Sequence, residues 1–206
     1  MPLAIAATKV QQAILMPQIA GPVTWLEHSG ELAAAEAPLL LDVVCNQKWQ
    51  PPPHKLVLLG HTTPTLAAIC PGALQAGRIC AWPGFLERPA WEVAVAAPVE
   101  AYWLLQMEVA IGKKLIPVAD VPGLVAPRTL AQIINEACYL LAEGAATSQD
   151  IDLAMQLGTN YPLGPLEWVR KIGTAPIYQL LETLAVQEPH FAPHALLKNP
   201  LPWPTS

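Results

Sequence analysis

The spacing of apolar residues changes character near residue 121 of this chain of 206 residues. Before that point, short β-prone runs are separated by Pro, Gly and small helical patches. Strands that alternate with short helices predict an α/β layer with a largely parallel, buried sheet. The expected strands are Leu3–Ala7, Pro22–Trp25, Leu39–Cys45, Leu56–Leu59, Arg78–Trp82, Trp91–Ala96 and Leu115–Val118.

After residue 121 the pattern is helical. Thr147 and Asp150 are spaced as a capping box, which predicts that a helix opens there. We expect this helix to turn Ile151, Ala154, Met155 and Gly158 inward. The preceding helix should end at Gly144, because its apolar stripe stops just before that glycine. The stripe consists of Leu130, Ile133, Ile134, Ala137, Leu140 and Leu141.

Proline residues mark the remaining boundaries of the helical part. Pro165 suits the first position of a helix, where a missing N–H costs nothing. A last amphipathic helix carries Ile177, Leu180, Leu181 and Leu184, and the proline-rich tail after Gln187 should run extended. We therefore expect an α/β domain over residues 1–120 and an all-α domain over residues 121–206.

Composition narrows the function classes. Hydrophobic residues make up 53% of the chain and charged residues 13%, with a net charge of −5 and no Lys/Arg cluster. This balance argues against nucleic acid and anionic membranes as partners. The N-terminus lacks the basic flank of a secretory signal, and no apolar stretch reaches the ~20 residues of a membrane span. These features predict a cytoplasmic protein.

The spacing of cysteine and histidine does not indicate a metal site. Cys45, Cys70, Cys80 and Cys138 form no C-x-x-C pair, so we expect buried free thiols rather than a disulfide framework or a zinc site. His190 and His194 are four residues apart, but Pro193 forbids a regular helix between them. No metal is therefore expected.

One segment carries a family resemblance. The residues from Asp150 to Trp168 read DIDLAMQLGTNYPLGPLEW. They resemble the pattern D-I-D-x-A-M-x-x-G-x-N-Y-P-x-G-P-x-E-W of the C-terminal helical domain in the 3-hydroxyacyl-CoA dehydrogenase family. The glycines and prolines specify a helix–turn–helix geometry, so we expect Tyr161 and Trp168 to be packing residues. The resemblance is strong over about residues 110–200 and continues upstream at Gly112-Lys113, Asp120–Gly123, Arg128–Leu130 and Asn135–Ala137.

The resemblance implies a Rossmann-like NAD domain before the helical domain, but the nucleotide fingerprint G-x-G-x-x-G is missing. The first strand is followed by Thr8–Gln12, and no two of the twelve glycines are separated by a single residue. Side chains at Thr8–Gln12 would occupy the space that a pyrophosphate needs. Asp42 follows no glycine loop, so a strand-end or capping role is expected. The segment before residue 110 is also short for this domain, so the fold should be a reduced Rossmann-like sheet.

The positions that carry catalysis in the family are altered here. The resemblance aligns the family's G-x-H-F-F-N-P motif with Gly77–Pro83, which puts Ile79 at the general base and Trp82 at the asparagine. Glu92 matches the glutamate that orients the base, but it has no imidazole to orient. Pro127 takes the place of the asparagine that contacts the substrate thioester.

Three weak candidates for a site remain, namely Glu92, His61 and Thr62. The loop Gly60–Thr65 corresponds loosely to the family's T-N-T-S-S segment, so hydroxyls of Thr62, Thr63 or Thr65 could act as donors. His61 could replace the missing base, although a histidine at a strand end is more often a capping or surface residue.

Two further pairs of polar residues have a functional and a structural interpretation. Lys113 and Lys114 could contact CoA phosphates, but adjacent lysines at a helix end are usually solvated. Asn135 and Glu136 lie within the resembling region, and we favour helix surface and interhelical hydrogen bonding for them. Neither pair is assigned to a site.

The expected function is that of a degenerate relative. We expect a non-catalytic member that binds an acyl-CoA or serves an enzyme as a partner, with a homodimer formed through the helical domain and no cofactor. The alternative is an active NAD-dependent 3-hydroxyacyl-CoA or 3-hydroxybutyryl-CoA dehydrogenase with an unorthodox site, in which His61 or a partner's residue acts as base.

Overall fold

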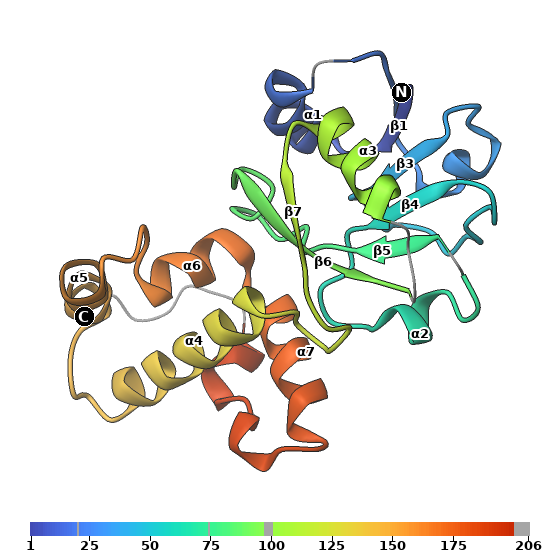
Figure 1. Cartoon of the computed structure of the whole chain (residues 1–206). Coiled ribbons are helices and arrows are strands. Elements are labelled where there is room, and N and C mark those ends of the chain that lie inside the picture. Colours follow the sequence, from blue (N-terminus) through green and yellow to red (C-terminus); the bar gives the residue numbers. More distant parts are fainter. Residues whose placement is uncertain (20, 74, 97–100, 200–206) are drawn as a thin grey trace. The chain divides into compact units, whose positions relative to one another are not determined.

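The computed structural model describes residues 1–19, 21–73, 75–96 and 101–199. The chain divides into two compact units, Met1–Leu124 and Val125–Ser206. Among the described residues, all seven strands lie in the first unit, while the second is built from helices and short turns (Figure 1). The predicted class, a Rossmann-like sheet followed by an all-α part, is confirmed.

The seven strands form one sheet in the order β2-β1-β3-β4-β5-β6-β7. The strands from β2 to β5 are parallel, β6 is antiparallel to β5, and β7 is parallel to β6. The order reverses between β1 and β3, which is where a doubly wound sheet opens a crevice at its carboxyl edge. The bounds are β1 Leu3–Ala6, β2 Val23–Leu26, β3 Leu39–Asp42, β4 Leu56–Leu59, β5 Ala76–Arg78, β6 Ala90–Val95 and β7 Lys114–Pro117.

The sheet is buried on both faces, as the continuous apolar runs of β1, β3 and β4 predict. One face packs against α1 (Lys9–Leu15) and α3 (Ala101–Ile111), which lie together in Figure 1. The other face packs against α2 (Leu66–Ile69) and the ring of Trp49. The two faces therefore have separate apolar cores.

The strand predicted at Arg78–Trp82 is displaced, because β5 spans Ala76–Arg78. Ala76 and Gly77 have low β-propensity, so the sequence pattern misses them. Their neighbours impose the strand: β4 and β6 flank Gly77 so closely that a Cβ there would lie 2.8 Å from Leu58 Cδ2. Beyond Ile79 the chain turns, and Phe85 N–H donates to Trp82 O.

The outer edge of β7 is closed to further strand pairing. The N–H of Lys114 donates to Pro89 O, next to β6, and the N–H of Val118 donates to Val93 O of β6. Of the remaining positions, Leu115 N–H donates to Glu108 Oε1 at 2.7 Å, and Pro117 has no N–H. An edge without free donors is a poor template for another strand.

Lys113 is not solvated, so that expectation is wrong. Its side chain is 3% exposed, and Nζ donates to Arg88 O at 2.7 Å and lies 5.5 Å from the centre of the Trp91 ring. Burial lowers the pKa of Lys113, and the charge of Glu87 partly offsets this. Lys114 is exposed, as predicted.

The predicted helices of the second unit are confirmed. The left-handed Gly144 (φ 68°) follows the first of them, and Pro165 begins the third as expected. Trp168 is buried in a packing position. The helices are α4 Ala126–Ala142, α5 Ser148–Thr159, α6 Pro165–Ile172 and α7 Thr174–Ala185.

The inner face predicted for α5 is partly wrong. Ile151 is buried, but Ala154 and Gly158 are exposed, and the buried polar residue is Asp152. Asp152 Oδ1 accepts hydrogen bonds from Leu166 N at 2.7 Å and Glu167 N at 3.4 Å. The carboxylate turns inward because it caps the first turn of α6.

Asn135 is not on the helix surface, so the expectation of a surface position is wrong for this residue. It is 1% exposed, donates from Nδ2 to Ala192 O at 2.9 Å, and accepts from His194 N at 2.8 Å through Oδ1. Glu136 is exposed. The tail that Asn135 holds contains the 3-10 turns Pro189–Phe191 and Ala195–Lys198, so it is not simply extended. Residues 200–206, with Pro200, Pro202 and Pro204, lie outside the described residues.

Candidate functional site

The start of α1 closes the place where a Rossmann helix receives a pyrophosphate. Thr8 Oγ1 accepts from Gln11 N at 3.3 Å, and Gln11 Oε1 accepts from Thr8 N at 2.9 Å. Gln11 Nε2 donates to Val43 O at 2.8 Å, so its side chain spans the carboxyl ends of β1 and β3. This capping box satisfies first-turn donors that a phosphate would otherwise use.

The residues at this edge therefore do not fit NAD. A bound pyrophosphate needs free helix amides and a loop without side chains, and Thr8 and Gln11 provide neither. Asp42, at the carboxyl end of β3, is 1% exposed and accepts from Ser29 Oγ at 3.0 Å and Cys45 N at 2.9 Å. Its other oxygen accepts from Trp49 Nε1 at 2.9 Å, which confirms the strand-end role.

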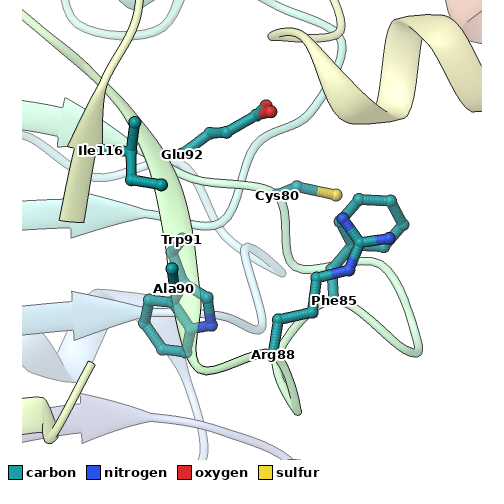
Figure 2. Close-up of a pocket in the computed structure, with 7 residues that line it drawn as sticks. All are labelled: Cys80, Phe85, Arg88, Ala90, Trp91, Glu92 and Ile116. Atoms are coloured by element: carbon teal, nitrogen blue, oxygen red, sulfur yellow. The ribbon is translucent and has the colours of Figure 1, made fainter. Parts of the chain in front are cut away.

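Glu92 lies on β6 and lines a cavity of about 180 Å³. Figure 2 shows its walls, where Arg88 reaches the ring of Phe85. The guanidinium carbon lies 3.9 Å from the centre of that ring. We call this space the Glu92 cavity; its other lining residues are Cys80, Ala90, Trp91 and Ile116.

Ile79, which the resemblance aligns with the family's general base, packs in the core. Ile79 is fully buried and belongs to the core beneath α1 and α3. Trp82 is buried and packs edge-on against Phe85, with ring centres 6.1 Å apart. Pro127 is buried in the first turn of α4. None of the described residues lining the Glu92 cavity is a histidine.

A donor that the sequence did not reveal lies on the cavity wall. Trp91 is 4% exposed, and its Nε1 has no hydrogen-bond partner among the described residues. A buried donor of this kind usually bonds to a ligand or water oxygen. Trp91 also belongs to the core beneath α1 and α3, so its buried N–H lies behind the wall of the Glu92 cavity, which Arg88 and Glu92 line together with Phe85 and Ile116.

The structure separates the other two candidate residues. Thr62 is 5% exposed and donates from Oγ1 to Cys80 Sγ at 3.3 Å, next to the Glu92 cavity. His61 is half-buried and lines a different pocket with Lys48 and Trp49. Burial raises the pKa of Cys80 to about 12, so its thiol stays protonated and is no nucleophile at neutral pH. Glu92 and His61 thus do not form one constellation.

Arg78 is a central residue that sequence reasoning missed. It is fully buried, and Nε pairs with Asp120 Oδ1 at 2.6 Å. Nη1 donates to the carbonyls of His61 and Thr62 at 3.3 and 2.9 Å, and Nη2 donates to Val121 O. The guanidinium therefore joins the end of β5 to the two segments that follow β4 and β7. In the sequence, the only sign of this role is that Arg78 is a charged residue within an apolar run.

The imidazole of His61 should make stability depend on pH. Burial lowers its pKa, and Arg78 adds to this, while Asp42 opposes it. Below about pH 6.5 the unfolded chain then binds more protons than the folded one, so stability should fall as the pH drops. Urea unfolding at about pH 5.5 and about pH 7.5 measures this loss. The loss should shrink in His61→Gln; an equal loss in both proteins would refute the assignment.

Neither a metal centre nor a membrane span emerges from the described part of the chain. No three His, Cys, Asp or Glu residues there are grouped to hold a metal. His194 Nδ1 accepts from Leu196 N, and His190 stacks on Phe191 with ring centres 4.1 Å apart. All four cysteines are free thiols. Within the described ranges, no helix combines the length and apolarity needed to cross a bilayer.

Comparison with known sequences identifies the second unit. Residues 123–205 match the family profile described as 3-hydroxyacyl-CoA dehydrogenase, C-terminal domain. A similar protein is 3-hydroxyadipyl-CoA dehydrogenase of Escherichia coli, 44% identical over 50% of this chain and 22% of that protein. Another is a probable 3-hydroxybutyryl-CoA dehydrogenase of Bacillus subtilis, 42% identical over 36% of this chain and 26% of that protein. The matched region thus spans about a quarter of these relatives.

Comparison with solved structures supports the fold of both units. FadB2 of M. tuberculosis matches with a TM-score of 0.69 at 18% identity, covering 85% of this chain and 68% of that one. (S)-3-hydroxybutyryl-CoA dehydrogenase PaaH1 of Ralstonia eutropha matches with a TM-score of 0.65 at 21% identity and the same coverage. At these identities the likeness shows the fold alone.

Proposed function

We propose that this chain, whose residues 123–205 match the C-terminal domain of 3-hydroxyacyl-CoA dehydrogenase, is a non-catalytic member of that family that binds an acyl-CoA. The observation that carries the proposal is the burial of Ile79 in the core, because the resemblance aligns this residue with the family's base. The chain's matched relatives are named as dehydrogenases of 3-hydroxyacyl-CoA compounds.

Loss of catalysis follows from the chemistry that is missing. Oxidation of a hydroxyl needs a base to take the proton while hydride leaves. Ile79 cannot accept a proton, and Pro127 has no side-chain donor for a thioester. A general base and oriented donors contribute factors of about 10² to 10⁴ each, so the ordinary reaction should be undetectably slow. The capping box at Thr8 removes the usual nucleotide site as well.

Acyl-CoA binding is supported by the Glu92 cavity. Its walls combine the apolar side chains of Phe85 and Ile116 with the charged side chains of Arg88 and Glu92, and the N–H of Trp91 is buried behind them without a partner among the described residues. A neutral donor such as this N–H suits a neutral acceptor, such as a thioester carbonyl. The proposal places the carbonyl end of the acyl group against Trp91.

A role as a dimer or as a partner of an enzyme is supported by an apolar surface on the second unit. Leu153 and Leu157 are four residues apart on α5 and are 51% and 79% exposed. Tyr139 and Leu140 on α4 are also exposed. Leu153 and Leu157, four residues apart, share one side of α5, and the proposal is that a second subunit covers them.

Thermal unfolding with three ligands tests the proposal. A medium-chain acyl-CoA should stabilise the protein by about 1 kcal/mol at several times its Kd, and CoA should do so less. Trp91→Phe should lose this difference, because it removes only the N–H and part of the ring. NADH should have no effect. Stabilisation by NADH would contradict the non-catalytic assignment. Identical thermal unfolding curves with and without acyl-CoA would contradict acyl-CoA binding.

The alternative is an active NAD-dependent dehydrogenase that uses His61 as its base. One observation favours it: burial lowers the pKa of His61, which keeps the imidazole neutral and able to accept a proton at neutral pH. This alternative predicts NADH consumption with a 3-ketoacyl-CoA and its loss in His61→Ala. The fate of NADH therefore separates the two functions.

A further inference from the structure

A second and larger pocket lies at the carboxyl ends of β3 and β4. It has a volume of about 560 Å³, within the range of about 300–1,000 Å³ that is typical of small-molecule sites. Its floor includes Leu59 at the end of β4 and Ile69 of α2, and its rim includes Lys48, Trp49 and His61. We call it the Lys48 pocket.

The Lys48 pocket lies on the opposite side of the sheet from a Rossmann nucleotide helix. Leu59, Ile69 and Trp49 belong to the core on the α2 face, whereas α1 packs on the other face. The described segment 43–55, between β3 and β4, contains neither helix nor strand and forms the rim. The pocket shares no lining residue with the Glu92 cavity, so this inference goes beyond the acyl-CoA site.

Bonds within the rim determine what the pocket offers a ligand. Trp49 Nε1 is tied to Asp42, so Trp49 presents its apolar ring rather than its N–H. Asn46 Oδ1 accepts from Ser29 N at 3.1 Å, and Gln47 Oε1 accepts from Gly30 N at 3.3 Å. These bonds anchor the loop on which Lys48 stands.

The described side chains that line the pocket include one cation, Lys48, while the carboxylate of Asp42 lies behind the ring of Trp49, whose Nε1 donates to it at 2.9 Å. Burial lowers the pKa of His61, which leaves that ring neutral at pH 7. Among the described lining residues, Lys48 is then the one charged group at neutral pH. Lys48 is exposed and has no ion pair among the described residues, so its ammonium can meet an incoming anion.

We propose that the Lys48 pocket binds a small monoanion with a flat aromatic body, of the arene carboxylate class. The carboxylate pairs with the ammonium of Lys48, and the aromatic body lies against Trp49 and the apolar floor of Leu59 and Ile69. One cation matches one negative charge, and aromatic rings bury large area at low entropic cost.

Naphthoate and its neutral isostere naphthamide test the proposal by titration calorimetry on the full chain. The native protein should bind naphthoate about tenfold more tightly than naphthamide, as one charge-assisted hydrogen bond allows. Lys48→Gln should weaken naphthoate binding about tenfold and leave naphthamide unchanged. Lys48→Arg should restore the preference. Trp49→Leu should weaken both ligands severalfold.

Lys114→Gln is the matched control, because Lys114 is exposed on β7 and does not line the pocket. It should leave both affinities unchanged. The proposal is overturned if the native protein does not bind naphthoate at millimolar concentration. It is also overturned if the preference for the anion survives Lys48→Gln. Neither result depends on whether the protein binds acyl-CoA or NADH.

Discussion

Replacing Arg78 by methionine is expected to destabilise the first unit by about 3 kcal/mol. Methionine keeps most of the buried volume but leaves Asp120 without its cation and the carbonyls of His61, Thr62 and Val121 without their donor. Breaking a buried ion pair typically costs about 3–5 kcal/mol. The side chain of Asp120 is 24% exposed and regains some hydration, so we expect the lower end.

Urea unfolding monitored by tryptophan fluorescence measures this effect, with Arg128→Met as the matched control. Arg128 pairs with Glu188 at 3.0 Å, but the two side chains are 28% and 49% exposed. An exposed pair contributes about 1 kcal/mol or less, so the control should remain close to the native protein. Equal losses for the two variants would show that Arg78 is not the clamp described above.

Replacing Gly164 by alanine is expected to destabilise the second unit by about 3 kcal/mol. A Cβ at this position would lie 2.3 Å from Asp152 Cβ and Oδ1, and 2.4 Å from Asp152 Cα. Because a backbone atom is among these contacts, a rotamer change cannot relieve the overlap. The turn would have to move away from α5, which weakens the cap that Asp152 provides to Leu166 N and Glu167 N.

Gly158→Ala is the control for this second prediction. Gly158 lies within α5 of the same motif, and a Cβ there would meet nothing within 4 Å. Alanine in a helix is about 0.5–1 kcal/mol more stable than glycine, so the same substitution should stabilise the protein. Thermal unfolding should thus shift in opposite directions for the two variants. A neutral Gly164→Ala would contradict the close approach of the two segments.

The helices of the second unit could be predicted because their signals are local. Thr147 caps α5, Pro165 opens α6 and Gly144 follows α4 in a left-handed conformation. Each signal acts within a few residues of the boundary that it sets. The burial of Asp152 was missed because its reason lies fourteen residues ahead, at the N–H of Leu166.

The same contrast between local signals and long-range contacts decides which features of the site could be predicted. Ile79 and Pro127, where the resemblance implies a base and an amide, are changes of residue type that can be read directly from the chain. The unpaired N–H of Trp91 and the clamp of Arg78 depend on which strands become neighbours. Lys113 was misjudged for the same reason, because its acceptor, Arg88 O, lies 25 residues away. Contacts between residues this far apart in the sequence leave no periodic pattern in it.

The most direct test of the central claim is the rate of NADH oxidation by the purified protein with a 3-ketoacyl-CoA. With Ile79 at the position that the resemblance assigns to the base, and Thr8 and Gln11 closing the nucleotide site, we predict no rate above that of a reaction without protein. A rate that rises in proportion to protein concentration and disappears in His61→Ala would contradict the account and establish an active dehydrogenase.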